Sequence, residues 1–199
     1  MFFLKQKKNT PIFFICIYLF FCLLADYLIN PIFESLFKNY NLGIRIFTIF
    51  EYTLCSIFFY KTLEKIKLKK IIIIVSPIFL IYSFIDFYFS NKTSFDSIPT
   101  GLSASLVLFY SMSFLFEKIN KPKISLLYNT QSFWITVGMI IYFSGTFFLF
   151  IFSQNIFENP EFRIMFDYLI LTFSIIRNLF FAIAFLLPPE KENTGFSIK

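Results

Sequence analysis

Histidine is absent from the 199 residues of this chain, and glycine is scarce, with only 5. Histidine is the commonest metal ligand and the side chain that titrates near neutral pH. Its absence excludes HExxH zinc chemistry and a Ser-His triad, and the few glycines form no phosphate-binding loop. The sequence therefore predicts no metal site, no cofactor and no catalytic residue of these kinds.

Cysteine is also rare. Cys16, Cys22 and Cys55 all fall within apolar runs, where a thiol behaves as a small hydrophobic group. Cys16 and Cys22 are six residues apart, which places them on different faces of a helix. This spacing argues against a disulfide or a metal pair.

Charged residues make up only 15% of the chain, whereas 57% is hydrophobic and 34 residues are Phe. A transmembrane helix needs about 20 mostly apolar residues, because every backbone polar group must be paired within the segment. Six stretches qualify, at about 11–30, 43–60, 71–90, 97–116, 132–153 and 164–187. The sequence predicts an all-α, polytopic transmembrane bundle of six helices, forming a single membrane domain over residues 1–199. The first segment is expected to be retained, since its apolar run is too long for a signal peptide and no small-residue cleavage site follows it.

The distribution of basic residues predicts the orientation, because Lys and Arg concentrate in cytoplasmic loops. With the N-terminus inside, 13 of the 18 basic residues fall on the cytoplasmic side, 4 fall outside, and Arg177 lies within a helix. The outer four are Lys38, Arg45, Lys92 and Arg163. Both termini are thus expected in the cytoplasm. The net charge of +6 is then explained by topology and by anionic lipid, so the predicted partner is membrane lipid and no nucleic acid.

Two charged residues fall near the centres of predicted helices. Glu51 interrupts the apolar run "IFTIFEYTLCSIFFY", and Arg177 interrupts the last segment. Ionisable groups at membrane depth are costly and usually face the bundle interior, so an ion pair between these two is expected. The simpler interpretation is a structural pair that fixes two helices; the alternative is a proton or ligand site. Residues near them in sequence that could extend a polar pocket are Thr48, Tyr52, Ser174 and Asn178.

A second polar group is predicted toward the outer side. Its acidic members are Asp26, Asp86, Asp96 and Asp167. These four residues from four segments could converge on an outward-opening cavity for a cation or an amine. The simpler alternative is that they are solvated charges at helix ends near the lipid headgroups.

Small residues recur at helical spacing in two segments. Ser97, Gly101 and Ser105 are four residues apart, and Gly138 and Gly145 are seven apart. Such patterns allow close approach of a neighbouring helix in a membrane. We expect both to be packing surfaces.

Several segments resemble an uncharacterised family of multi-helix membrane proteins from Bacteroidota-type bacteria. The segments that carry the resemblance are "FWITVGMIIYFSGTFFLFIFS", "IFTIFEYTLCSIFFYKTL", "FDSIPTGLSASLVLFYSMSFLFEKI" and "IIRNLFFAIAF". Members of that family often have seven helices, one more than is predicted for this chain, and similar segments occur in front of or beside sensor histidine kinases. The resemblance implies a bacterial inner-membrane location and a histidine kinase or other membrane-associated partner. It also marks positions of interest without assigning them a role: Glu51, Tyr52, Trp134, Gly138, Tyr142, Ser144, Gly145, Arg177 and Asn178.

Three functions remain open on the sequence. The favoured one is a non-enzymatic sensory or scaffolding bundle that acts with a partner protein or as a homo-oligomer. The basic loops 61–70 and 117–125 are then either docking surfaces or simple topology signals. The second is a small transporter or channel component that uses Glu51 and Arg177 at the midplane, although no inverted repeat is visible. The third is an intramembrane enzyme acting on lipid, with carboxylates such as Asp26, Asp86 and Asp167 as acid and base.

Overall fold

The computed structural model describes residues 10–25, 40–89, 97–120, 127–156 and 160–189. Within these ranges the chain forms α-helices and one short 3-10 helix, η2 (Leu127–Asn129). The α-helices are α1 (Thr10–Leu24), α3 (Tyr40–Thr62), α4 (Ile66–Phe89), α5 (Ser97–Ile119), α6 (Gln131–Ile156) and α7 (Pro160–Leu186). The predicted all-α class with six helices is confirmed for the described residues. The last part of the first predicted segment, residues 26–30, lies outside them.

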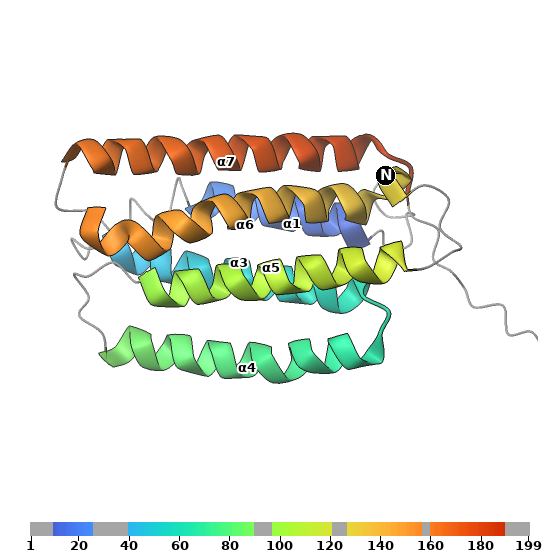
Figure 1. The fold of residues 1–199 in the computed structure, drawn as a ribbon, viewed down its shortest axis with the longest axis horizontal. Helices are drawn as coiled ribbons and strands as arrows, with labels where there is room; N and C mark the ends of the chain where they lie inside the picture. Colours follow the sequence, from blue (N-terminus) through green and yellow to red (C-terminus); the bar gives the residue numbers. More distant parts are fainter. Residues whose placement is uncertain (1–9, 26–39, 90–96, 121–126, 157–159, 190–199) are drawn as a thin grey trace, which may run out of the picture.

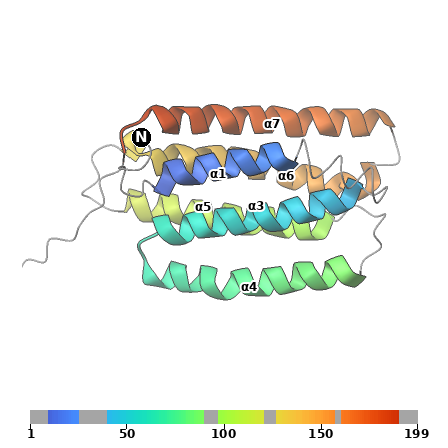
Figure 2. The same cartoon turned by 180° about the vertical axis from the view of Figure 1, so that it is seen from behind.

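The helices run along a common direction in four layers (Figure 1). α1, α3, α5 and α6 form the middle of the bundle, where α1 contacts α3 and α6, and α5 contacts α3 and α6. α7 covers α6 and α1 on one side, and α4 covers α3 and α5 on the other. The reverse view in Figure 2 shows the same order, with α1 and α3 nearest the viewer. α4 and α7 are therefore the outer helices, on opposite flanks.

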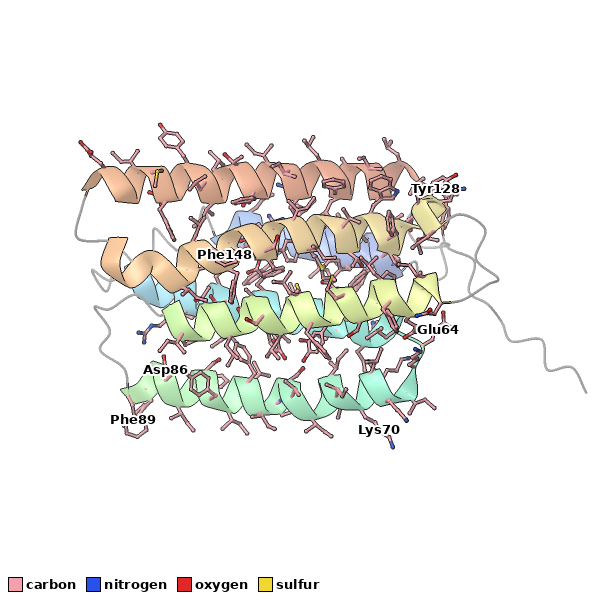
Figure 3. The ribbon with its side chains drawn as sticks, in the orientation of Figure 1. Glu64, Lys70, Asp86, Phe89, Tyr128 and Phe148 are labelled. Atoms are coloured by element: carbon pink, nitrogen blue, oxygen red, sulfur yellow. The ribbon has the colours of Figure 1, made fainter. Side chains whose placement is uncertain are left out.

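Successive helices are antiparallel, so alternate connections lie at the same end of the bundle (Figure 1). α1 starts and α7 ends at one end, where α3 is followed by α4 and where α5 ends. Described lysines gather at this end, which we call the Lys-rich end: Lys61, Lys65, Lys67, Lys69, Lys70 and Lys118. Figure 3 shows Glu64 and Lys70 at this end and Asp86 and Phe89 at the other.

Four of the described helices, α4, α5, α6 and α7, are long and apolar enough to cross a membrane, as judged by length and composition. α3 has 23 residues but also carries Arg45, Glu51 and Lys61, which lower its hydropathy. α1 is apolar but is described over only 15 residues. The protein is thus a membrane-embedded helix bundle, in which the least apolar long helix lies in the middle.

The two outer helices expose most of their apolar side chains. In the most apolar windows of α4 and α7 only 17% of the residues are buried, compared with 50% in α5. Such helices are stable in hydrocarbon but not in water, since their exposed apolar surface would be large. The flanks of the bundle therefore face lipid.

Glu117 organises the turn between α3 and α4. Its buried carboxylate accepts hydrogen bonds from the backbone N–H groups of Glu64, at 2.8 Å, and Lys65, at 3.2 Å. These N–H groups lie at the start of α4, where helical donors have no partner within the helix and negative charge is favoured. The salt bridge from Lys118 Nζ to the Glu64 carboxylate, at 2.9 Å, adds a second link between α5 and this turn.

Candidate functional site

Glu51 and Arg177 meet inside the bundle. Arg177 Nη1 of α7 lies 3.7 Å from Glu51 Oε1 of α3, and the two side chains are only 5% and 9% exposed. α3 and α7 are not neighbouring layers, so the long arginine side chain spans the gap between them. The contact expected from the sequence is thus present, but it is not made by the two side chains alone.

Tyr18 of α1 connects the two charges. Its hydroxyl donates a hydrogen bond to Glu51 Oε1 and accepts one of 2.7 Å from Arg177 Nη1. Tyr18 is only 1% exposed, so the bridge is shielded from solvent and lipid. Hydrogen bonds that satisfy buried charges offset part of the cost of taking them out of water. The Glu51–Tyr18–Arg177 cluster therefore joins α1, α3 and α7 through one buried network.

Aromatic rings enclose the guanidinium group of Arg177. Its Cζ lies 4.2 Å from the ring centroid of Tyr142 on α6, 4.9 Å from that of Tyr18 and 5.9 Å from that of Phe181. A cation within about 6 Å of a ring face is stabilised by the ring's quadrupole, more so where water is excluded. α6 thus becomes the fourth helix in contact with the cluster.

Gly138 places α7 close enough to α6 for this contact. A Cβ atom at Gly138 would lie 3.0 Å from Phe180 Cβ and 3.2 Å from the backbone oxygen of Arg177. Tyr142 follows Gly138 by one helical turn and lies on the same face. The missing side chain at Gly138 and the ring of Tyr142 together create the position that Arg177 occupies.

The structure gathers only part of the polar pocket that was expected. Asn178 Oδ1 accepts hydrogen bonds from Arg177 Nε, at 3.3 Å, and Nη2, at 3.4 Å. Ser174, half-buried, lies one turn before Arg177 on α7. Tyr52, which could have extended this pocket, instead places its hydroxyl beside those of Ser76 and Tyr110, because successive helical residues are turned by about 100°. Thr48 likewise lines a different cavity.

Tyr52 belongs to a second polar contact, on the α4 side of the bundle. Its hydroxyl lies 3.1 Å from the hydroxyls of Ser76 on α4 and Tyr110 on α5. Beside this contact, α3 and α4 enclose a cavity of about 240 Å³, which we call the α3–α4 cavity. It is lined by five residues of α3 between Tyr52 and Tyr60 and by five of α4 between Ile72 and Leu80.

Of the two interpretations of the outer acids, convergence on one cavity does not occur for the two that are described. Asp86 lies on α4 and the exposed Asp167 lies on α7, and these helices flank the bundle on opposite sides. Asp26 and Asp96 lie outside the described residues. The sequence indicates the depth of a residue along its helix but not the order of the helices around the bundle, so it left both interpretations open.

Asp86 instead shares a small cavity with Arg45. The cavity has a volume of about 10 Å³, at the lower limit for one water molecule, and lies between α3, α4 and α5. Arg45 is only 5% exposed, so it is not a solvated charge at a helix end. Ser83, Thr48 and Thr100 also line the cavity.

Both small-residue patterns lie at helix contacts. A Cβ at Gly145 would clash with the Phe173 ring on α7, so Gly145, like Gly138, faces α7. A Cβ at Gly101 would lie 3.4 Å from Ile151 on α6, an ordinary contact distance. Ser105 Oγ donates to the Gly101 oxygen of its own helix, and the side chain of Ser97 is not described.

None of the three cysteines, all of which are described, forms a disulfide: Cys55 is buried, Cys22 half-buried and Cys16 exposed. Across the described ranges, no three His, Cys, Asp or Glu side chains are grouped as they would be to hold a metal ion.

Comparisons of the chain with protein-family models, with curated proteins and with solved structures give no match.

Tyr18 is the member of the cluster that the sequence analysis missed. It is one of 11 tyrosines, and it lies in an apolar run like most of them. A polar hydroxyl near the middle of the first segment was the available signal. Tyr142 was marked only through the family resemblance, and its place beneath Arg177 depends on the packing of α6 against α7.

Proposed function

We propose that this protein is a non-enzymatic sensory or scaffolding bundle of a bacterial cytoplasmic membrane that acts together with a partner protein. The observation that carries the proposal is the Glu51–Tyr18–Arg177 cluster, which connects α1, α3 and α7 and rests against α6. A buried network of this kind has one well-satisfied arrangement. Separating the helices would leave an unpaired charge, so the network favours this packing of the bundle over others.

The Lys-rich end supports the partner side of the proposal. We infer that this end lies in the cytoplasm, with both termini there, because cytoplasmic loops are enriched in Lys and Arg. The turn held by Glu117 fixes the α3–α4 connection against α5. A histidine kinase or another membrane-associated protein docking at this end would then contact a surface whose helices are coupled to the buried cluster.

Transport is less well supported. Neither the α3–α4 cavity nor the cavity beside Arg45 is lined by Glu51 or Arg177. A proton or solute would need a water-filled path to reach such a site. The lipid-enzyme alternative loses support because Asp86 and Asp167 lie on opposite flanks, whereas acid–base catalysis needs its two groups on one substrate.

The test is affinity purification of the tagged full chain from its native membrane in mild detergent, followed by mass spectrometry. We expect a stoichiometric partner with the wild-type chain, and at least a severalfold change in its recovery with Glu51→Gln. The matched control is Asp167→Asn, which removes an exposed acid distant from the cluster. Recovery of the chain alone, or as a homo-oligomer, would refute the partner. Equal recovery with Glu51→Gln would refute the coupling through the cluster.

A further inference from the structure

The α3–α4 cavity lies on the flank of the bundle, away from the Glu51–Tyr18–Arg177 cluster on which the proposed function rests. Four of its lining residues are exposed on the flank of the bundle: Pro77, Ile57 by 48%, Tyr60 by 41% and Ile73 by 54%. The cavity therefore opens between the two helices toward the surrounding lipid. It extends along α3 from Tyr52 to Tyr60, eight residue steps or about 12 Å at 1.5 Å per residue.

The inner wall of the cavity has an unused hydrogen-bond donor. Ser56 is only 5% exposed, and its hydroxyl has no hydrogen-bond partner among the described residues. Thr53, one turn earlier, instead donates to the Ile49 oxygen within α3, at 2.7 Å. A buried polar group without a partner costs free energy, which a ligand carrying an acceptor would recover once the Ser56 side chain turned toward the cavity.

Pro77 of α4 adds a second polar feature. Proline has no N–H, so the carbonyl of Ile73, four residues earlier, lacks its usual helical donor. Both residues line the cavity. The accessible surface of the wall is nonetheless almost wholly apolar, as suits an acyl chain.

Lysines continue the lining faces beyond the cavity at the Lys-rich end. Lys69 precedes Ile73 by four residues, and Lys61 follows Ile57 by four, so each lies one turn beyond the cavity. Lys69 Nζ lies 5.4 Å from the ring centroid of Tyr60, which places it over a residue of the cavity mouth. An anionic group at this position would be attracted by both lysines.

We propose that the α3–α4 cavity binds one acyl chain of an anionic phospholipid from the leaflet at the Lys-rich end. The phosphate lies beside Lys69 and Lys61, the chain continues toward Leu80, and an ester carbonyl accepts a hydrogen bond from Ser56 once that side chain turns toward the cavity. At about 240 Å³ the cavity is smaller than the roughly 300–1,000 Å³ of sites that enclose a whole drug-sized ligand. It accordingly takes one segment of a larger molecule whose remainder stays in the bilayer.

The experiment uses the purified full chain in phosphatidylcholine nanodiscs that contain phosphatidylglycerol with a photoactivatable diazirine on one acyl chain. We expect crosslinks at cavity-lining residues of α3 and α4 in preference to the outer face of α7, which is equally exposed to lipid. Unlabelled phosphatidylglycerol should compete for these crosslinks, whereas added phosphatidylcholine or free fatty acid should not.

Three variants sharpen the test. Lys69→Gln should reduce the cavity crosslinks about fivefold, since one lysine near an anionic surface contributes on the order of a fivefold gain in affinity. Lys67→Gln is the matched control, because this exposed residue lies on the opposite side of α4 and its loss should change nothing. Ser56→Leu fills the cavity and should abolish the crosslinks; if this variant does not fold, the two lysine variants still decide the outcome.

The proposal would be overturned by crosslinks spread evenly over α4 and α7. It would also be overturned if phosphatidylcholine or fatty acid competed as well as phosphatidylglycerol, or if Lys69→Gln and Lys67→Gln behaved alike.

Discussion

Arg177 reaches the interior of the bundle from a helix that is otherwise mostly exposed to lipid. Its guanidinium group has donors in a fixed planar arrangement, and the structure uses them on Tyr18 and Asn178 while Tyr142 covers one face. A lysine at this position could not satisfy two acceptors and stack on a ring in the same way. The chemistry of the single residue thus determines how many helices it can connect.

The first prediction concerns the ion pair. Glu51→Gln and Arg177→Gln should each destabilise the folded bundle by about 1–3 kcal/mol, because each leaves the other charge buried and unpaired. The double variant should recover at least about 1 kcal/mol of the summed loss, since neither charge then remains. Unfolding of the purified protein in mixed micelles, followed by circular dichroism, measures all four members of the cycle.

Strictly additive losses would contradict the energetic coupling of the two residues. Asp167→Asn serves as the control, because an exposed side chain of this kind should change stability by no more than about 0.5 kcal/mol.

At the scale of the helix, the contact between α6 and α7 places glycines of α6 against the backbone and aromatic side chains of α7. Gly138 admits the backbone of α7 at Arg177, and Gly145 admits the ring of Phe173. In lipid there is no hydrophobic force between helices, so close backbone approach contributes to association through van der Waals contact. The spacing of seven residues keeps both glycines on one face of α6.

The second prediction compares two glycines. Gly138→Ala places a methyl group 3.0 Å from Phe180 Cβ and 3.2 Å from a backbone oxygen, so α7 must shift. We expect a loss of about 1–3 kcal/mol in the unfolding free energy, as for other overpacked sites. Gly101→Ala meets Ile151 only at 3.4 Å and should change stability by less than about 0.5 kcal/mol. The same micelle unfolding assay measures the two variants. Equal losses of unfolding free energy would contradict a special requirement for close helix approach at Gly138.

At the scale of the whole molecule, the antiparallel order of the helices collects the described lysines at one end. The stretch 61–70 is separated from Lys118 by two passes through the bundle, so both reach the same side (Figure 1). Because the surface potential of the inner leaflet is negative, this arrangement favours one orientation in the membrane.

The third prediction tests that orientation. Lys70→Cys and Phe89→Cys lie at opposite ends of α4 (Figure 3) and are made in a chain whose three native cysteines are replaced by alanine. In bacterial spheroplasts a membrane-impermeant maleimide should label Phe89→Cys directly, and Lys70→Cys only after the membrane is permeabilised. Labelling in the reverse order would invert the proposed topology.

Several features follow from residues that are close in sequence. Six apolar segments gave six helices, because each must satisfy its own backbone hydrogen bonds. The glycine spacing in α6 gave a packing face because the helical period is fixed. By contrast, Tyr18 and Glu51 are 33 residues apart, and Tyr18 and Arg177 are 159 apart, so no local pattern relates them.

The sequence by itself determined the helical class, the approximate positions of the apolar helices and the depths of Glu51 and Arg177 along them, since these depend on composition and on the rise per residue; α3, α4 and α7 each begin three to five residues earlier than predicted. Only the tertiary structure decided which helices are neighbours. That order places Tyr18 between the two charges, separates Asp86 from Asp167, and opens the α3–α4 cavity beside Ser56. In lipid, helix order is set by side-chain packing at specific contacts, and a hydropathy pattern does not record which contacts form.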